Sequence, residues 1–186
     1  MQLSVRRFQG ESGERFSILV DDTGMPLYYP ALYVTAEMRG ASLSINTIDN
    51  ALSALKAMHA WQDHYHLDLE SRFKRSELLL AHEIHSLRDF MQKPLETMWS
   101  KGGKVVAFKG RQKRVAKENQ YNRMTIIAGY IRFLAGRLYP VTPTSVREID
   151  ALVGQIKANR PKIADKTEKD RSDSYLAEAV LDAVEE

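Results

Sequence analysis

Cysteine is absent from this chain of 186 residues. Disulfide scaffolds, thiolate metal sites and cysteine nucleophiles are therefore excluded. Long apolar runs are also missing: the longest stretch without a charged residue, Thr23 to Ala36, contains two of the six prolines. A membrane-spanning helix needs about 20 apolar residues, so none is predicted. The first residues carry charges without an apolar core. We therefore expect no secretory signal, no membrane partner and a cytoplasmic protein.

Motifs of common catalytic and cofactor sites are missing as well. The chain has no Gly-x-Gly-x-x-Gly, no phosphate-binding loop and no nucleophile elbow. His85-Ser-Leu-Arg88 has the spacing of a His-x-x-Arg signature, but it lies inside a helical pattern without upstream catalytic residues. His82 and His85 are one helical turn apart, yet structural zinc usually needs four ligands. We expect no catalytic residue, no cofactor and no metal.

Two short strands are predicted within residues 1–40. The segments 3–8 and 15–20 alternate apolar and polar residues, with Gly10 and Gly13 between them. The second segment ends in Asp21-Asp22-Thr23-Gly24, a sequence typical of turns. The segment 27–29 is a candidate third strand, although the prolines on either side exclude a central position.

The apolar period changes to that of helices after residue 41. Ser44 or Asn46 is the expected N-cap of the first helix, Pro94 stops the second, and the third ends before Pro140. Thr142-Pro143 predicts the start of the fourth. The four apolar patterns cover residues 45–58, 80–91, 124–138 and 146–156. The helical spacing of four aromatic residues predicts packing in the core rather than stacking on nucleobases: Trp61, Trp99, Tyr130 and Phe133.

Acidic residues are almost missing between residues 101 and 123, where Glu118 is the only one. The net charge of the chain is only +3, but eight cations gather in this segment: Lys101, Lys104, Lys109, Arg111, Lys113, Arg114, Lys117 and Arg123. Clustered cations bind a polyanion by releasing its counterions, so the segment predicts contact with nucleic acid. Its three glycines allow close approach of the backbone. The alternative interpretation is a solvated loop without a ligand.

The start of the third predicted helix adds side chains that can recognise bases. Asn119, Asn122 and Arg123 lie in its first turns, and Asn and Arg form bidentate hydrogen bonds to base edges. Helix N-termini also suit phosphate groups. Together with the basic segment, these residues are the main candidate DNA-binding site.

The end of the chain has a different composition. Residues 162–171 are charged and predict a linker, and a weak helical pattern follows at Leu176, Val180 and Val184. Five acids and no base lie between residues 172 and 186. We therefore expect three parts: a β-strand unit over residues 1–40, a helical domain over 41–161, and over 162–186 a linker followed by the start of an absent domain.

Three segments resemble the N-terminal half of tyrosine recombinases, the phage integrase family. Residues 15–30 are similar to the amino-terminal strands of integrases from mobile elements. Residues 44–61 resemble the first helix of the core-binding domain, and residues 119–135 resemble a later helix. The resemblance implies a mainly α fold, in which a four-helix orthogonal bundle of the SAM-like type follows a small N-terminal β-strand unit. It also implies double-stranded DNA at a recombination site and other recombinase protomers as partners.

The catalytic residues of that family have no counterparts here. The family uses two Arg, a Lys and His residues to stabilise charge on the phosphate, and a Tyr attacks it. The sequence after Arg160 is too short for a domain of that size. We therefore expect that this chain is not an enzyme by itself, and that its last helical pattern belongs to the missing catalytic half.

The leading hypothesis is thus the DNA-binding portion of a tyrosine recombinase. On this hypothesis, polar helix faces supply three further candidate contacts: Lys56, Arg132 and Arg147. The alternative is a helical adaptor that binds another protein through apolar helix faces, with the basic segment serving only solubility. Salt dependence of DNA binding separates the two hypotheses.

Overall fold

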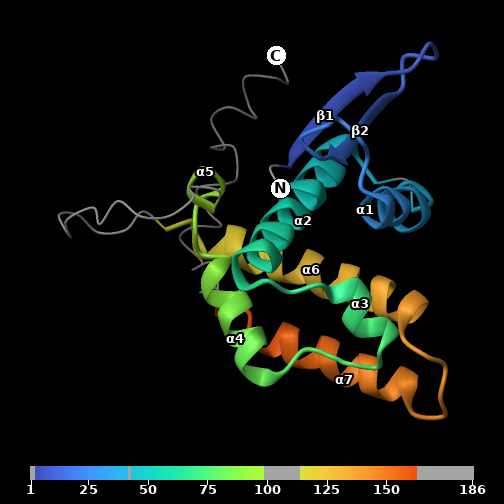
Figure 1. The fold of residues 1–186 in the computed structure, drawn as a ribbon. Coiled ribbons are helices and arrows are strands. Elements are labelled where there is room, and N and C mark those ends of the chain that lie inside the picture. The colour runs from blue at the N-terminus through green and yellow to red at the C-terminus, as the bar shows by residue number, and fades with distance from the viewer. Residues whose placement is uncertain (1–2, 42, 99–113, 163–186) are drawn as a thin grey trace, which may run out of the picture.

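The computed structural model describes residues 3–41, 43–98 and 114–162, which are mainly helical with a small two-stranded antiparallel sheet at the N-terminus (Figure 1). No helix within these ranges is long and apolar enough to cross a membrane. The elements in chain order are β1 (Ser4–Gln9), β2 (Arg15–Val20), α1 (Tyr28–Tyr33), the π-helix η1 (Val34–Arg39), α2 (Ile45–Tyr65), α3 (Leu69–Lys74), α4 (Ala81–Phe90), α5 (Leu95–Met98), α6 (Lys117–Leu138) and α7 (Ser145–Ala158).

The two predicted strands are confirmed as a hairpin. Arg7 is paired with Ser17 and Gln9 with Arg15, so these four side chains share one face of the ribbon. The loop is closed by a hydrogen bond of 2.8 Å from the Gly10 N–H to a carbonyl four residues later. β2 has the predicted bounds, and β1 is displaced by one residue at each end.

The candidate third strand at residues 27–29 is wrong. Pro26 forms a single bridge to Val20, and the Leu27 N–H donates to the Leu19 carbonyl at 2.9 Å, but α1 begins at Tyr28. The reason is local: Asp21 Oδ1 accepts hydrogen bonds from backbone N–H groups of the following turn, which reverses the chain. Pro26 has no N–H with which to extend a strand pairing.

The predicted start of α2 and end of α6 are confirmed. Ser44 is the N-cap of α2, and its Oγ accepts a hydrogen bond of 3.3 Å from the Thr47 N–H. α2 is longer than predicted and ends at Tyr65, and its C-cap is His66, whose φ of 54° is left-handed. α6 ends at Leu138, before Pro140. α7 begins at Ser145, later than predicted, because residues 142–145 first form a turn in which the Ser145 N–H donates to the Thr142 carbonyl.

Four short helical elements of the described chain were not predicted: α1, η1, α3 and α5. Asp68 caps α3, and its Oδ1 accepts a hydrogen bond of 3.1 Å from the Ser71 N–H. α3 is joined to α4 by Arg72, which donates to the Leu78 carbonyl at 2.9 Å and forms an ion pair of 2.5 Å with Glu83. Burial acts to raise the pKa of Glu83, but the hydrogen bonds from Arg72 and from the Leu80 N–H outweigh it and leave that pKa below its ordinary value.

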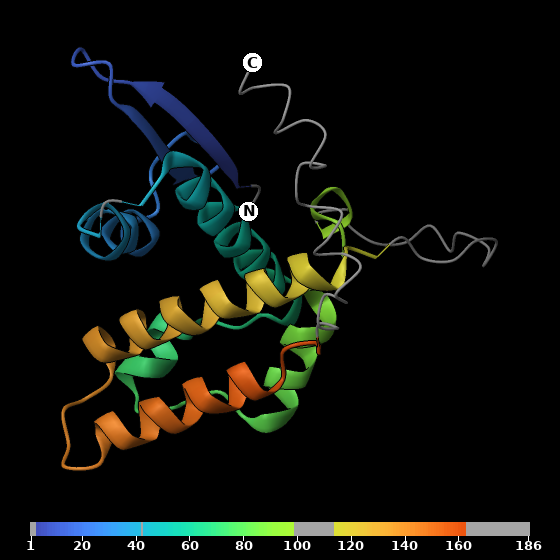
Figure 2. The same cartoon turned by 180° about the vertical axis from the view of Figure 1, so that it is seen from behind.

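One hydrophobic core joins the hairpin to the helices. Leu3 and Leu19 of the hairpin region belong to the same buried cluster as Trp61 of α2 and Ile156 of α7. Trp61, Tyr130 and Phe133 are buried, as their spacing predicted, whereas Trp99 lies outside the described residues. Both views show α2 crossing α6, with α7 alongside α6 and the hairpin at the N-terminal end of α2 (Figures 1 and 2). The predicted linker and last helix lie outside the described residues from residue 163 onward.

Candidate nucleic-acid interface

The start of α6 presents several of the candidate DNA-binding residues to solvent. Arg114, Lys117, Asn119 and Asn122 are all exposed. The N-cap position is Ala116, whose side chain cannot accept a hydrogen bond from the first turn of the helix. Within the described part of the chain, no side chain at the N-cap satisfies the backbone N–H groups of that turn, and such groups suit an anion. The first turn also contains the exposed acid Glu118, which opposes an anion there.

Arg123 has a structural role, in contacts between α6 and the end of α4, that the sequence did not indicate. It is half-buried, and its Nη1 donates to the Met91 carbonyl at 2.9 Å and to the Lys93 carbonyl at 2.8 Å. These carbonyls follow the end of α4, where helices leave acceptors without intrahelical partners. Burial lowers the pKa of the Arg123 guanidinium. This side chain thus fixes the first turns of α6 against the end of α4.

Two further contacts hold the same junction. The buried Gln120 side chain donates to the Arg88 carbonyl at 2.9 Å, and the Val115 N–H donates to the Gln92 carbonyl at 2.9 Å. The chain before α6 and the first turns of α6 are therefore anchored to the end of α4 and to the residues that directly follow it. Five candidate cations of the intervening segment lie outside the described residues: Lys101, Lys104, Lys109, Arg111 and Lys113.

The three additional candidates are not gathered at the start of α6. Arg132 lies 15 residues after Lys117, about 22 Å along the helix. Its guanidinium forms an ion pair of 2.9 Å with Asp150 of α7, which compensates part of its charge. Arg147 is exposed in the first turn of α7, and Lys56 is half-buried on α2. Of the candidates that the structure describes, four exposed residues at the start of α6 thus make up the candidate patch: Arg114, Lys117, Asn119 and Asn122.

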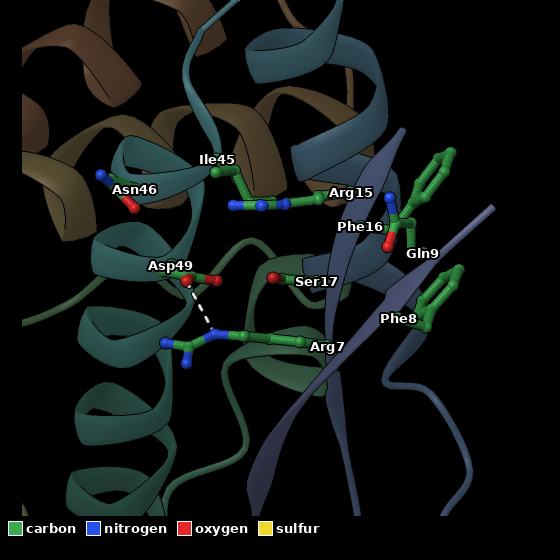
Figure 3. Close-up of a pocket in the computed structure, with 9 residues that line it drawn as sticks. All are labelled: Arg7, Phe8, Gln9, Arg15, Phe16, Ser17, Ile45, Asn46 and Asp49. Carbon is green, nitrogen blue, oxygen red and sulfur yellow. Dashed lines mark ion pairs between the residues drawn. The ribbon is translucent and has the colours of Figure 1, made fainter. Parts of the chain in front are cut away.

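A second polar site, which was not predicted from the sequence, lies at the N-terminal end of α2 (Figure 3). It is a cavity of about 430 Å³ between the hairpin and the first turns of α2, and its lining includes Arg7, Arg15, Ser17 and Asp49. The alternation of the two strands places the two Arg and the Ser on one face. That signal was present in the sequence, but the contact with α2 depends on the tertiary fold.

Comparison with known proteins finds no matching family model, no matching curated protein and no matching solved structure. Function is therefore inferred from the residues and their placement.

Proposed function

We propose that this chain is the DNA-binding portion of a site-specific tyrosine recombinase. It binds duplex DNA at a recombination site, together with other recombinase protomers, and strand cleavage belongs to catalytic residues that this sequence lacks. The observation that carries the proposal is the exposed patch from Arg114 to Asn122, which lies within the basic segment of residues 101–123. Arg114 and Lys117 contact phosphates, while Asn119 and Asn122 provide the sequence preference.

The proposed framework for this patch is the four-helix orthogonal bundle of a SAM-like core-binding domain, formed by α2, α4, α6 and α7. Support comes from the crossing of α2 and α6, the lateral packing of α7 on α6, and the core that these helices share (Figures 1 and 2). The anchoring of α6 by Arg123 and Gln120 supports it further, because recognition side chains need a fixed register relative to DNA.

A helical adaptor that binds another protein is the second candidate function. It is favoured by two exposed apolar side chains beside the turn between α6 and α7, Val141 at 95% and Val146 at 69% exposure. Contiguous exposed apolar patches mark contact sites for proteins, and an adaptor needs such a patch around these two residues. On that alternative, DNA binding is weak and insensitive to the identity of the cations near α6.

The test compares two double variants of the full chain on the same duplex over a range of salt concentrations. Arg114→Ala with Lys117→Ala removes two charges from the patch, and Lys74→Ala with Arg75→Ala removes two exposed charges from the end of α3. We expect the first variant to weaken binding and to flatten the salt slope by about one unit for each lost phosphate contact. The control variant leaves the slope unchanged. Equal slopes for both variants and the parent chain would refute the proposal.

A further inference from the structure

The cavity between the hairpin and α2 contains two buried oxygens without hydrogen-bond partners among the described residues. Ser17 is only 4% exposed, and its Oγ is one of them. The other is Asp49 Oδ1, while Oδ2 of the same carboxylate pairs with Arg7 Nε at 2.8 Å. Figure 3 shows the Ser17 hydroxyl directed toward Asp49 across the cavity. A buried polar group without a partner costs about 1–3 kcal/mol, so the arrangement favours a ligand that satisfies both oxygens.

Cationic groups surround these oxygens. The Arg15 side chain extends from β2 across the cavity toward Ile45 and Asn46, in the first turn of α2 (Figure 3). It forms no ion pair within the described part of the chain, and Glu14, the acid next to it, is paired with Arg39 instead. Arg7 pairs with Asp49 through Nε, and its Nη atoms form no ion pair with any residue that the structure describes. The positive end of the dipole of α2, a helix of 21 residues, also faces this side.

This set of groups selects an anion that also carries a proton to donate. The guanidinium groups of Arg7 and Arg15 suit the oxygens of a phosphate or carboxylate. Asp49 Oδ1, however, can only accept a hydrogen bond, and it repels an anion whose oxygens all lack protons. The Ser17 hydroxyl can donate to the same anion.

We propose that this cavity binds a phosphomonoester through its singly protonated phosphate group. The phosphate hydroxyl donates to Asp49 Oδ1, and the remaining oxygens accept from Arg15, Arg7 and the Ser17 hydroxyl. A phosphodiester has no such hydroxyl, so its charged oxygen meets the carboxylate and is rejected. The cavity thus differs in chemistry from the patch at the start of α6, which is suited to the diester backbone of DNA. A free small phosphomonoester and the terminal phosphate of a DNA strand are two sources of the same group.

The experiment titrates the full chain with methyl phosphate and with dimethyl phosphate, followed by NMR. We expect methyl phosphate to bind at least about tenfold more tightly than the diester, and roughly tenfold more tightly at about pH 5 than at about pH 7, since the second pKa of a phosphomonoester is about 6. Equal binding of the two probes, or no binding of methyl phosphate to the folded chain, would overturn the proposal.

Variants assign the effect to the cavity. Arg15→Gln should weaken methyl phosphate binding by about tenfold. Arg6→Gln is the matched control, since Arg6 is exposed on the opposite face of β1, and it should bind like the parent. Asp49→Asn should remove the discrimination against dimethyl phosphate, because an amide can also donate. If Asp49→Asn fails to fold, Ser17→Ala replaces it, with an expected loss of about threefold to tenfold. Unchanged binding in Arg15→Gln contradicts the proposal.

Competition identifies the source of the phosphate group. Displacement of methyl phosphate by a 5′-phosphorylated duplex, but not by the same duplex without the phosphate, supports a DNA terminus. Binding of methyl phosphate that neither duplex displaces supports a free small phosphomonoester. Equal displacement by both duplexes would contradict the selectivity for monoesters.

Discussion

At the start of α6, Arg123 and Gln120 each donate to backbone carbonyls at 2.8–2.9 Å, whereas in the cavity beside β2 the buried oxygens of Ser17 and Asp49 have no such partners within the described chain. Both regions bury polar groups, but only the first satisfies them among the described residues. A satisfied network adds stability and fixes geometry. An unsatisfied one costs stability and is retained where a ligand completes it. The two regions therefore differ in their expected response to substitution.

His59 extends the comparison, because its ring contains a third buried polar atom without a hydrogen-bond partner among the described residues. Its Nε2 is buried without a hydrogen-bond partner within the described residues, and His59 is not among the residues that line the cavity. Burial lowers the pKa of His59 from 6.5 to about 4. Between pH 6.5 and about pH 4, His59 is therefore neutral in the folded state and protonated in the unfolded state. Stability should be full above pH 6.5 and should fall as the pH decreases toward 4.

This loss of stability is expected to exceed the effects of substitution at Arg123 and at Ser17, and it reaches up to about 3 kcal/mol at about 1.4 kcal/mol per pKa unit. Urea unfolding over this pH range measures it, and His59→Gln should remove most of the dependence. The exposed His85, changed to Gln, is the matched control and should keep it. Glu83 does not interfere in the upper part of the range, since its pKa lies below 4.5. A parent chain equally stable at both ends of the range would show that His59 accepts a proton in the folded state.

Arg123 tests the satisfied region. Arg123→Met keeps most of the aliphatic stem but leaves the Met91 and Lys93 carbonyls without this donor. Hydrogen bonds from a charged group contribute about 1.5–3 kcal/mol, so we expect a loss of about 2 kcal/mol in the free energy of unfolding. Arg114→Met, at an exposed position before α6, should stay within about 0.5 kcal/mol of the parent. If Arg123→Met were as stable as the parent and lost only DNA binding, Arg123 would be a recognition residue instead.

These roles separate what the sequence could predict from what it could not. Ser44 as an N-cap and the end of α6 before Pro140 were predictable, because capping and proline geometry act within a few residues. α3 was missed because it has only six residues, and Asp68 capping it is a weak signal without the packing of Phe73 in the core. α1 formed where a strand was predicted, because the turn that Asp21 stabilises reverses the chain just before it.

The candidate site residues also fall into two groups: those whose placement local sequence predicts, and those that only the tertiary fold brings together. Asn119 and Asn122 are exposed near the start of α6, and the local sequence places them in the first turns of this helix. The contacts of Arg123 span 30 and 32 residues, and the cavity joins Arg15 and Ser17 to Asp49, more than 30 residues away. Such pairs are created by the tertiary fold, and the residue types alone do not specify them.

The smallest stability effect is expected at Ser17. Its hydroxyl is buried without a partner within the described chain, so Ser17→Ala removes a desolvated group and breaks no contact that the structure contains. Replacing such a group with a methyl is nearly neutral or stabilising, so we expect no loss in the free energy of unfolding.

Ser86 provides the matched control for this substitution. Ser86 is partly buried, and its Oγ accepts from Trp61 Nε1 at 3.0 Å and donates to the Glu83 carbonyl at 2.9 Å. Ser86→Ala leaves the buried Trp61 N–H unpaired and should cost about 1–3 kcal/mol. Urea unfolding of both variants at neutral pH measures the difference. A loss at Ser17 as large as that at Ser86 would mean that the Ser17 hydroxyl is already satisfied in the free protein, for instance by a bound water, and the contrast between the two regions would disappear.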